Sequence, residues 1–507
     1  MTAEDWKKLQ NGSDIRGVAM EGIPDQPVNL TPEVARNLGH ALVHYLKDLK
    51  RKNTPDLRIA VGTDSRISGP VLKNNFMEGI VSMGSNAIDV GLASTPAMFF
   101  TTIMEPGHID CGVMLTASHL PFNRNGFKFF TSEGGFDKQD IAKLIEHAST
   151  VKYNDSSRKG NINNLNFIDN YARFLRDKIK EEIQADAPEL PLGGFKIIVD
   201  AGNGCGGFFV EKVLKPLGAD TRGSLYLEPD GMFPNHIPNP EAPEALSALK
   251  KAVLDNDADL GIIFDTDVDR AAVIDHKGEE VNRNRLIALM SYITLKDHPG
   301  STIVTDSITS EGLTEFIENE LKGKHHRYKR GYKNVINEAI RLNQTGNDCW
   351  LAIETSGHAA MRENYFLDDG AYMVVKILIS MVNMRKQGIM IPDLISKLKE
   401  PQEDMEFRLK LNTIDFRNKG TRIIEDLTNQ VKNIPGWEVV PNNYEGVRVS
   451  CGENNGNGWF LLRLSLHDPL LVLNIQSEEP GGVDKIKTIL SEHLNKFTEL
   501  DSSSLKK

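Results

Sequence analysis

Apolar residues recur along the chain with two different periods. Residues 34–49 and 71–83 carry them at the spacing of amphipathic helices, and residues 59–61 form a short apolar strand between these helices. Alternating helices and strands are typical of a doubly wound sheet with helices on both faces. The pattern therefore predicts an α/β fold built from several such units.

Stretches rich in proline, glycine or charged residues divide the chain into blocks. They are residues 185–194, 297–300 and 400–404. Further apolar strands are predicted at residues 195–200, 303–306 and 470–475. A helix is expected at residues 484–497, and the polar tail at residues 501–507 is expected to fray.

The composition is that of a multidomain globular protein. The 507 residues suffice for three or four domains, each with its own core. A net charge of -11 argues against general nucleic-acid binding, and no apolar run is long enough to span a bilayer. The amino terminus lacks the basic and apolar regions of a signal peptide, so we expect a cytoplasmic protein. The 4 cysteines have no metal-ligand spacing and are predicted to be reduced and buried.

Candidate chemistry starts after an apolar strand at residues 112–115. The next loop contains Ser118, and Lys128 lies on the strand predicted at residues 127–130. A serine alone is a weak nucleophile, so it needs a base, a cation, or prior phosphorylation that makes it a phosphoryl donor. The alternative is an ordinary hairpin loop, because turns also use Ser, Asn, Pro and Gly.

A second loop follows the apolar strand at residues 260–263 and contains Asp265, Asp267 and Asp269. Three carboxylates at this spacing repel one another unless a cation neutralises them, and such oxygen ligands suit Mg²⁺. We therefore predict a Mg²⁺ site, with an oxygen of phosphorylated Ser118 as a further ligand. An alternative is the aspartyl nucleophile of haloacid-dehalogenase-type phosphatases, but Asp269 stands where that motif has Thr or Val.

Together the two loops resemble those of the α-D-phosphohexomutase superfamily of phosphoglucomutases, phosphomannomutases and phosphoglucosamine mutases. Residues 116–121 resemble the family's Thr-Ala-Ser-His-Asn-Pro loop, and residues 265–270 resemble its Asp-Gly-Asp-x-Asp-Arg loop. Further family elements follow in the family's order at residues 12–17, 62–66, 199–204 and 354–358. In the first of these, Asp14 replaces a family glycine.

The resemblance implies three mixed α/β domains and a smaller α+β carboxyl-terminal domain around one central cleft. We expect four domains with separate tasks. They are a phosphoserine-bearing domain at residues 1–190, a metal-binding domain at 191–298, a sugar-recognition domain at 299–402 and a phosphate-binding domain at 403–507.

The resemblance also assigns roles in phosphoryl transfer. Ser118 would carry the transferable phosphoryl group and, once phosphorylated, would share Mg²⁺ with the three carboxylates. Arg270 would stabilise charge on the transferring group, and Arg16 would be a further catalytic cation near Lys128. Lys128 would take the proton of the sugar hydroxyl, with its pKa lowered by these cations, and His358 would be a second acid or base or only a hydrogen-bond donor.

Substrate-binding positions are implied in several further segments. They are His119, Lys329, Arg330, Glu354, Ser356, Arg463, Ser465 and His467. Glu354 and Ser356 match the loop that contacts sugar hydroxyls, and Lys329 and Arg330 lie in the other substrate loop.

The distal phosphate loop departs from the family pattern Arg-Pro-Ser-Gly/Asn-Thr-Glu-Pro-x-x-Arg. Arg463 and Ser465 are retained. Three positions differ: Leu466 for Gly or Asn, His467 for Thr, and Val472 for the closing Arg. Loss of a charge-assisted phosphate contact costs about 1.5–3 kcal/mol. A weaker grip favours escape of a hexose 1,6-bisphosphate intermediate, which makes the enzyme a net bisphosphate synthase.

The main hypothesis is a glucose-1,6-bisphosphate synthase that uses fructose 1,6-bisphosphate as donor and glucose 1-phosphate or 6-phosphate as acceptor. The alternative is an ordinary phosphoglucomutase or phosphomannomutase. A remote alternative is a non-catalytic sugar-phosphate-binding regulator, which the presence of Ser118 and Lys128 disfavours. The expected cofactors are Mg²⁺ and phosphorylated Ser118, and the expected partners are hexose phosphates and bisphosphates, with no nucleic acid and no membrane. We expect a monomer or weak homodimer.

Overall fold

The computed structural model describes residues 2–104, 109–183, 187–465 and 468–506. The chain forms two compact units. Unit 1 comprises Met1–Leu286 and Ser356–Asp393, and unit 2 comprises Ile287–Thr355 and Leu394–Lys507. Across the described ranges, no helix combines the length and apolar character that a bilayer crossing requires.

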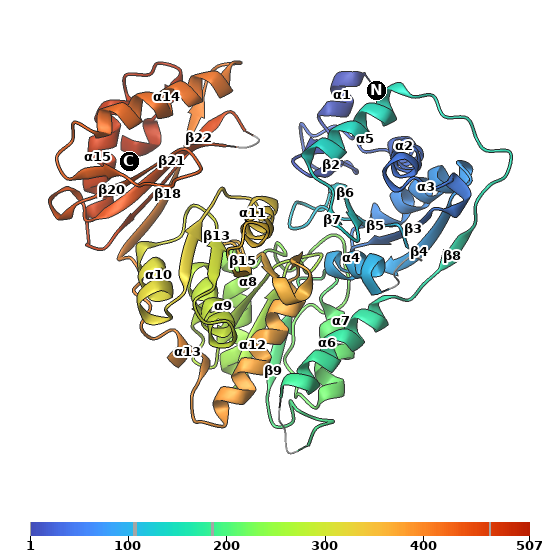
Figure 1. Cartoon of the computed structure of the whole chain (residues 1–507), viewed down its shortest axis with the longest axis horizontal. Helices are drawn as coiled ribbons and strands as arrows, with labels where there is room; N and C mark the ends of the chain where they lie inside the picture. Colours follow the sequence, from blue (N-terminus) through green and yellow to red (C-terminus); the bar gives the residue numbers. More distant parts are fainter. Residues whose placement is uncertain (1, 105–108, 184–186, 466–467, 507) are drawn as a thin grey trace. The chain divides into compact units, whose positions relative to one another are not determined.

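The amino-terminal part of unit 1 contains a mixed sheet with strand order β1-β2-β6-β5-β3-β4-β8, and β7 pairs with β6. Its strands are β1 (Gln10–Asn11), β2 (Asp14–Val18), β3 (Arg58–Thr63), β4 (Asn86–Leu92), β5 (Cys111–Leu115), β6 (Arg124–Thr131), β7 (Gly134–Gly135) and β8 (Ile162–Asn164). Its helices are α1 (Ala3–Lys7), α2 (Pro32–Lys50), α3 (Gly69–Ser82), α4 (Thr95–Met104), α5 (Lys138–Thr150) and α6 (Ile168–Glu182). Helices α2, α3 and α5 share one apolar core with one face of the sheet (Figure 1). Helix α4 packs on the other face, where Gly112 permits a close approach: a Cβ there would lie 2.3 Å from the carbonyl oxygen of Met98.

Helix α2 illustrates why the predicted elements form. The side chain of Thr31 accepts a hydrogen bond from the backbone N–H of Val34 at 3.3 Å, and Pro32 occupies the first helical position. Leu38 and Leu42 belong to an apolar stripe that is fully buried. The helix predicted at residues 34–49 is confirmed, and the capping residues explain its earlier start.

The second sheet of unit 1 has strand order β12-β11-β10-β9. Its strands are β9 (Ile197–Asp200), β10 (Leu260–Phe264), β11 (Ala271–Asp275) and β12 (Glu280–Val281). The helices α7 (Gly207–Phe209) and α8 (Pro243–Asp255) accompany it, and unit 1 also contains the antiparallel pair β16 (Ala359–Met361) and β17 (Leu367–Asp368), followed by α12 (Gly370–Arg385). Helices α9 (Arg283–Asp297) and α13 (Ile391–Leu394) contain the points at which the chain passes between units. Strand β10 is buried along its whole length, which explains its uninterrupted apolar sequence.

Unit 2 begins with parallel strands in the order β14-β13-β15. Its first elements are β13 (Thr302–Thr305), α10 (Glu311–Glu315), β14 (Lys324–Arg327), α11 (Tyr332–Gln344) and β15 (Cys349–Ile353). An antiparallel sheet with strand order β19-β20-β21-β22-β18-β23 follows. Its elements are β18 (Glu403–Leu411), α14 (Phe416–Val431), β19 (Trp437–Val439), β20 (Val447–Cys451), β21 (Gly458–Leu464), β22 (Leu470–Ser477), α15 (Gly482–Leu494) and β23 (Leu500–Asp501). Helices α14 and α15 share one core with this sheet (Figure 1).

The α/β class and the α+β character of the carboxyl-terminal part are therefore confirmed, and the four cysteines are buried free thiols. The expectation that the tail frays is wrong. Strand β23 pairs with β18, and Leu505, which is 2% exposed, packs into the same apolar core. A single leucine that can be buried outweighs the polar composition around it. The division at residues 190, 298 and 402 stays a prediction.

Candidate active site

Two loops that leave the ends of buried strands meet in unit 1. One follows β5 and carries Ser118, and the other follows β10 and carries Asp265. The Ser118 hydroxyl donates a hydrogen bond to Oδ2 of Asp265 at 2.9 Å. Since Ser118 is only 9% exposed, this contact is largely shielded from water. The fold thus joins the two segments that the sequence analysis singled out for chemistry.

Both loops contain backbone conformations that side-chain-bearing residues seldom adopt. The angle φ is 50° at Ser118 and 66° at Val268. Such conformations cost on the order of 1–3 kcal/mol, are least favourable for β-branched residues, and cluster at functional sites. The Ser118 backbone N–H donates to Oγ1 of Thr116 at 2.9 Å, which helps to hold the first loop.

Arg66 fixes the Ser118 loop from the end of the adjacent strand β3. Its side chain is fully buried, and Nε donates to Asp64 at 3.2 Å. The remaining guanidinium nitrogens donate to four backbone carbonyls at 2.5 to 3.0 Å, those of Ser118, Leu120, Pro121 and Arg124. The sequence analysis matched this segment to a family element but gave Arg66 no role. The Asp-x-Arg spacing after an apolar strand was the available signal.

Asp265, Asp267 and Asp269 form a buried acidic cluster. One carboxylate oxygen of each lies within 4.8 Å of the others, and all three residues are 0% exposed. The Oδ1 atoms of Asp267 and Asp269 have no hydrogen-bond partner among the described residues. Burial and the two neighbouring carboxylates raise the pKa of Asp265 well above its usual range. Orphaned carboxylate oxygens at this density fit a divalent cation, which would supply the missing positive charge.

Lys128 on β6 contacts the same cluster. Its Nζ donates to Oδ2 of Asp267 at 3.0 Å and also to Asp269. The hydroxyl of Thr95 is a further donor to Asp267. The sequence analysis expected cations around Lys128, whereas its nearest partners are carboxylates, which stabilise a protonated amine.

Arg270 lies between the acidic cluster and the serine. Its Nε donates to Oδ2 of Asp265 at 3.2 Å, and its Nη2 donates to the Ser118 hydroxyl oxygen at 3.2 Å. The same Nη2 donates to Nδ1 of His119 at 2.6 Å. Burial, with Arg270 and Arg16 nearby, lowers the pKa of His119 to about 2, so this imidazole is neutral at neutral pH. A guanidinium at this distance from Ser118 can stabilise charge on a phosphoryl group there.

Arg16 reaches the Ser118 loop from β2. Its Nη1 donates to the carbonyl of Thr116, and its Nη2 donates to Oδ2 of Asp14 at 2.9 Å. Asp14 is the residue that departs from the family glycine. The departure therefore provides a carboxylate that orients Arg16.

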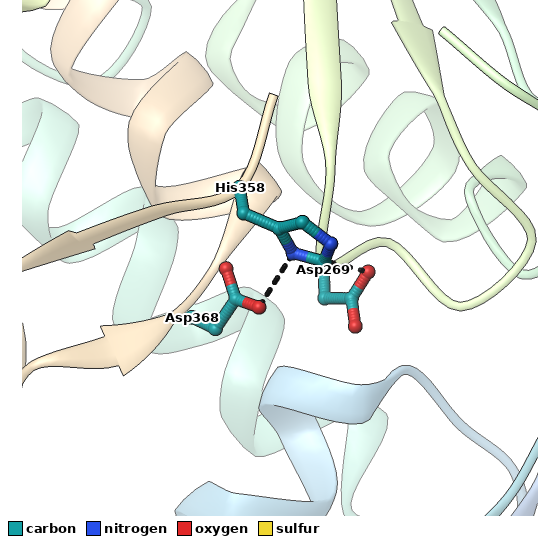
Figure 2. A group of neighbouring side chains, drawn as sticks. All are labelled: Asp269, His358 and Asp368. Atoms are coloured by element: carbon teal, nitrogen blue, oxygen red, sulfur yellow. Dashed lines mark hydrogen bonds and ion pairs between the residues drawn. The ribbon is translucent and has the colours of Figure 1, made fainter. Parts of the chain in front are cut away.

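His358 lies between two carboxylates (Figure 2). Its Nδ1 is 2.6 Å from Oδ2 of Asp368 and 3.9 Å from Oδ1 of Asp269. Burial alone lowers the pKa of His358, but Asp368 and Asp269 outweigh it and raise the pKa to about 9. Ser356 precedes His358 in the same loop of unit 1. The sequence analysis did not identify Asp368, although the Asp-Asp-Gly before α12 was a visible helix-start signal.

The other predicted substrate residues lie in unit 2, where Glu445 connects several of them. Glu445 accepts hydrogen bonds from the Ser307 hydroxyl at 2.5 Å and from the Arg330 backbone N–H at 3.1 Å, and its Oε1 is 3.8 Å from Nη1 of Arg463. Glu354 is buried and accepts from the backbone N–H of Gly331 at 2.6 Å. The sequence analysis missed Glu445, because nothing in its local sequence marks it.

The remaining positions are only partly described. Lys329 is exposed beside Arg330. The Ser465 hydroxyl accepts from the backbone N–H of Asp468 at 3.2 Å. His467, together with Leu466, lies outside the described residues. Val472 is 4% exposed and pairs with Arg463 across the sheet.

Comparisons with known proteins agree with this fold and site. Three models of the phosphoglucomutase/phosphomannomutase family match the chain, α/β/α domain I at residues 7–155, domain II at residues 170–278 and domain III at residues 282–398. A phosphomannomutase/phosphoglucomutase of Pseudomonas syringae pv. tomato is 31% identical over 484 residues, which is 95% of this chain and 94% of the relative. A phosphoglucomutase of Neisseria gonorrhoeae is 28% identical over 94% of each chain. The crystal structure of a phosphoglucomutase/phosphomannomutase family protein from Burkholderia thailandensis has 25% identity and a TM-score of 0.77 over 98% of both chains.

The fold and the site define a multidomain α/β protein with a serine and an acidic cluster at its strand ends. With these matches, the chain belongs to the phosphoglucomutase/phosphomannomutase family of the α-D-phosphohexomutase superfamily.

Proposed function

We propose that this protein is a phosphohexomutase that interconverts hexose 1- and 6-phosphates through phosphorylated Ser118. The observation that carries the proposal is the position of the Ser118 hydroxyl, 2.9 Å from Asp265 and 3.2 Å from Nη2 of Arg270. A serine against a buried acidic cluster and a guanidinium suits phosphoryl transfer, which depends mainly on positioning and charge neutralisation. Relatives named phosphomannomutase and phosphoglucomutase support hexose phosphates as the substrate class.

Transfer takes place in two steps of opposite direction. A sugar hydroxyl oxygen forms a bond to phosphorus while the bond from phosphorus to Ser118 Oγ breaks, and a base takes the hydroxyl proton. In the second step, Ser118 Oγ bonds to the other phosphorus of the bisphosphate while the bond from that phosphorus to the sugar oxygen breaks, and the protonated base returns its proton to the sugar oxygen. Arg270 and Arg16 stabilise the transferring group. Mg²⁺ held by Asp265, Asp267, Asp269 and phosphorylated Ser118 would neutralise charge on the phosphoryl oxygens.

The contacts favour His358 over Lys128 as the base. The Lys128 ammonium is bonded to two carboxylates, whereas Asp368 contacts only the Nδ1 side of the His358 ring. Asp368 and then Asp269 raise the pKa of His358 to about 9, and a cation on Asp269 would remove the second of these contributions. Lys128 then neutralises part of the negative charge of the acidic cluster and of the phosphoryl group.

Recognition of the sugar and of its second phosphate is assigned to the remaining residues. Glu354 and Ser356 would bind vicinal hydroxyls, and Arg463 with Ser465 would bind the distal phosphate. Three further residues are proposed to bind substrate, namely Lys329, Arg330 and His119. These roles rest on the family resemblance of the segments that carry the residues and on the match to relatives along most of the chain.

A second candidate is a glucose-1,6-bisphosphate synthase with fructose 1,6-bisphosphate as donor. One observation favours it: the distal loop has a buried Val472 where the family has arginine, and Arg463 is already near Glu445. Weaker retention of the bisphosphate would turn a mutase into a net synthase.

Phosphorus NMR distinguishes the two candidates. Glucose 1-phosphate, Mg²⁺ and a catalytic amount of glucose 1,6-bisphosphate should give glucose 6-phosphate if the protein is a mutase. With fructose 1,6-bisphosphate in stoichiometric amount, accumulating glucose 1,6-bisphosphate would instead establish the synthase. Absence of both reactions would contradict the proposal, and excess chelator should abolish either one.

Intact-mass spectrometry and peptide mapping test the covalent step. Phosphate on Ser118 supports the transferase, whereas phosphate only on Asp265 would support the phosphatase alternative. Asp267→Asn should lower Mg²⁺ affinity and slow transfer together, because it removes one of the three carboxylates.

A further inference from the structure

His358 and Asp368 form a hydrogen-bonded pair in unit 1. The Nδ1–Oδ2 distance of 2.6 Å is short for an imidazole–carboxylate contact. Figure 2 shows the second ring nitrogen, Nε2, on the side of the imidazole away from Asp368. Asp368 is buried, and its Oδ1 has no hydrogen-bond partner among the residues that the structure describes. Among the described residues, the one hydrogen bond of the Asp368 side chain is therefore the bond to Nδ1 of His358.

The fold fixes both members of the pair. Strands β16 and β17 pair in the register Ala360↔Asp368, so Asp368 lies diagonally opposite the residue that precedes β16. The backbone of His358 forms a bridge with Arg270 at the end of the acidic loop. The ring is therefore anchored to the same segment that carries the cation ligands.

The adjacent Asp369 has a different task. It caps α12 by accepting from the backbone N–H of Tyr372 at 2.8 Å, and it accepts from the Tyr171 hydroxyl at 2.6 Å. Helix capping thus needs only Asp369. The two adjacent buried aspartates therefore differ in their contacts: Asp369 caps the helix, and Asp368 contacts the histidine.

We propose that Asp368 is a positioning residue for phosphoryl transfer: it accepts the Nδ1–H of His358 and so fixes the ring with Nε2 as the nitrogen that faces the sugar hydroxyl. A neutral imidazole carries one proton that either nitrogen can hold, and a carboxylate on Nδ1 selects the tautomer whose Nε2 can accept. It also fixes the ring plane, as carboxylate partners do for other functional histidines. The inference rests on the proposed function, in which His358 is the base.

Asp368→Asn is the direct test, because the amide keeps the size of the carboxylate but its NH₂ group can donate to Nδ1 and favour the wrong tautomer. We expect kcat to fall about 100-fold while KM stays within about twofold. Asp369→Asn is the matched control and should change thermal stability with kcat retained. A normal kcat in Asp368→Asn would overturn the inference.

A double-mutant cycle separates positioning from an independent role. In a His358→Gln background, Asp368→Asn should reduce kcat by less than about twofold, since the residue acts only through the imidazole. Additive losses in a slow His358→Gln enzyme would leave the proposed function intact and refute the positioning role. A His358→Gln enzyme with normal kcat would instead remove His358 as the base, and the positioning role with it.

Proton NMR of the unmodified protein gives a readout that does not depend on the folding of a variant. A short Nδ1–H···O contact should give a far-downfield imidazole resonance. The signal should vanish in His358→Gln and persist in Asp369→Asn. A wild-type spectrum without such a resonance in the presence of Mg²⁺ would contradict the pair.

Discussion

The Ser118 cluster in unit 1 and the Glu445 cluster in unit 2 are organised differently. The first comprises Ser118, the three carboxylates and Arg270, and it is linked by hydrogen bonds of 2.9 to 3.2 Å. The second comprises Ser307, Arg330, Glu445 and Arg463. In this cluster, Nη1 of Arg463 lies 3.8 Å from Glu445, and Nε of Arg330 lies 3.9 Å from the neighbouring Asp306.

Under the proposed function, this difference would match the separate demands of phosphoryl transfer and of phosphate binding. Charges that act on a transferring group are most effective when they are fixed before the reaction, so short buried contacts suit the Ser118 cluster. Cations that bind an incoming phosphate must exchange an existing partner for it, and weakly held pairs make this exchange less costly. If Arg463 binds phosphate as proposed, Glu445, which lies 3.8 Å from its guanidinium, would compete with that phosphate.

The largest expected effect is that of removing the group on which the Ser118 cluster is centred. Ser118→Ala should reduce turnover by about 10³-fold or more, because no oxygen remains to carry the phosphoryl group. Steady-state kinetics and thermal melts of Ser118→Ala and of a control, Ser132→Ala in an exposed turn, measure the effect. Near-normal activity with an unaltered fold would refute the mechanism as a whole.

The next largest effect should come from removing the side chain that anchors the Ser118 loop. Arg66→Met keeps much of the side-chain volume but removes the guanidinium that donates to Asp64 and to four backbone carbonyls. Breaking a buried pair of this kind costs about 3–5 kcal/mol, so the first unfolding transition should move to lower temperature. Loss of kcat should accompany it, since the Ser118 loop loses its anchor. Arg58→Met at an exposed position of β3 is the control, and equal melting curves would contradict the anchoring role.

Much of the Ser118 cluster could be predicted from the sequence, because its chemistry is concentrated in two short loops. Apolar strands followed by Ser118 and by Asp265 mark where reactive groups leave a sheet. The supporting contact of Arg66 was harder to predict, since its Asp-x-Arg spacing does not specify which backbone it binds. Arg66 is 52 residues from the carbonyl it binds at Ser118, and nothing local specifies that approach.

Less of the Glu445 cluster was predictable, for the same physical reason. Arg463 and Arg330 stand out through family positions, but Glu445 joins them only through tertiary contacts. At the polar tail, the local sequence led to a wrong prediction. Its composition predicts fraying, yet Leu505 alone provides enough apolar surface to dock it.

A smaller effect should follow from removing the competing anion. Glu445→Gln keeps hydrogen-bonding capacity but eliminates the negative charge near Arg463. Affinity for hexose phosphates should rise about fivefold, equivalent to about 1 kcal/mol. Isothermal titration with glucose 1,6-bisphosphate measures it, with Glu453→Gln at an exposed position of unit 2 as control. Weaker binding in Glu445→Gln would show that Glu445 supports these cations and does not compete with phosphate.

The smallest expected change in reaction rate comes from a variant that should alter which product is released. Val472 is buried and pairs with both Arg463 and Arg408 across the sheet, so an arginine there adds a third cation beside Arg463. If loose retention of the bisphosphate causes net synthesis, Val472→Arg combined with His467→Thr should tighten the bisphosphate and shift products toward the isomerised monophosphate. The ratio of released bisphosphate to isomerised monophosphate at fixed donor is the measurement, and Val472→Met, which matches size without charge, is the control. An unchanged ratio in a folded double variant that binds bisphosphate more tightly would mean that retention does not decide the product, and that donor access or a conformational step does.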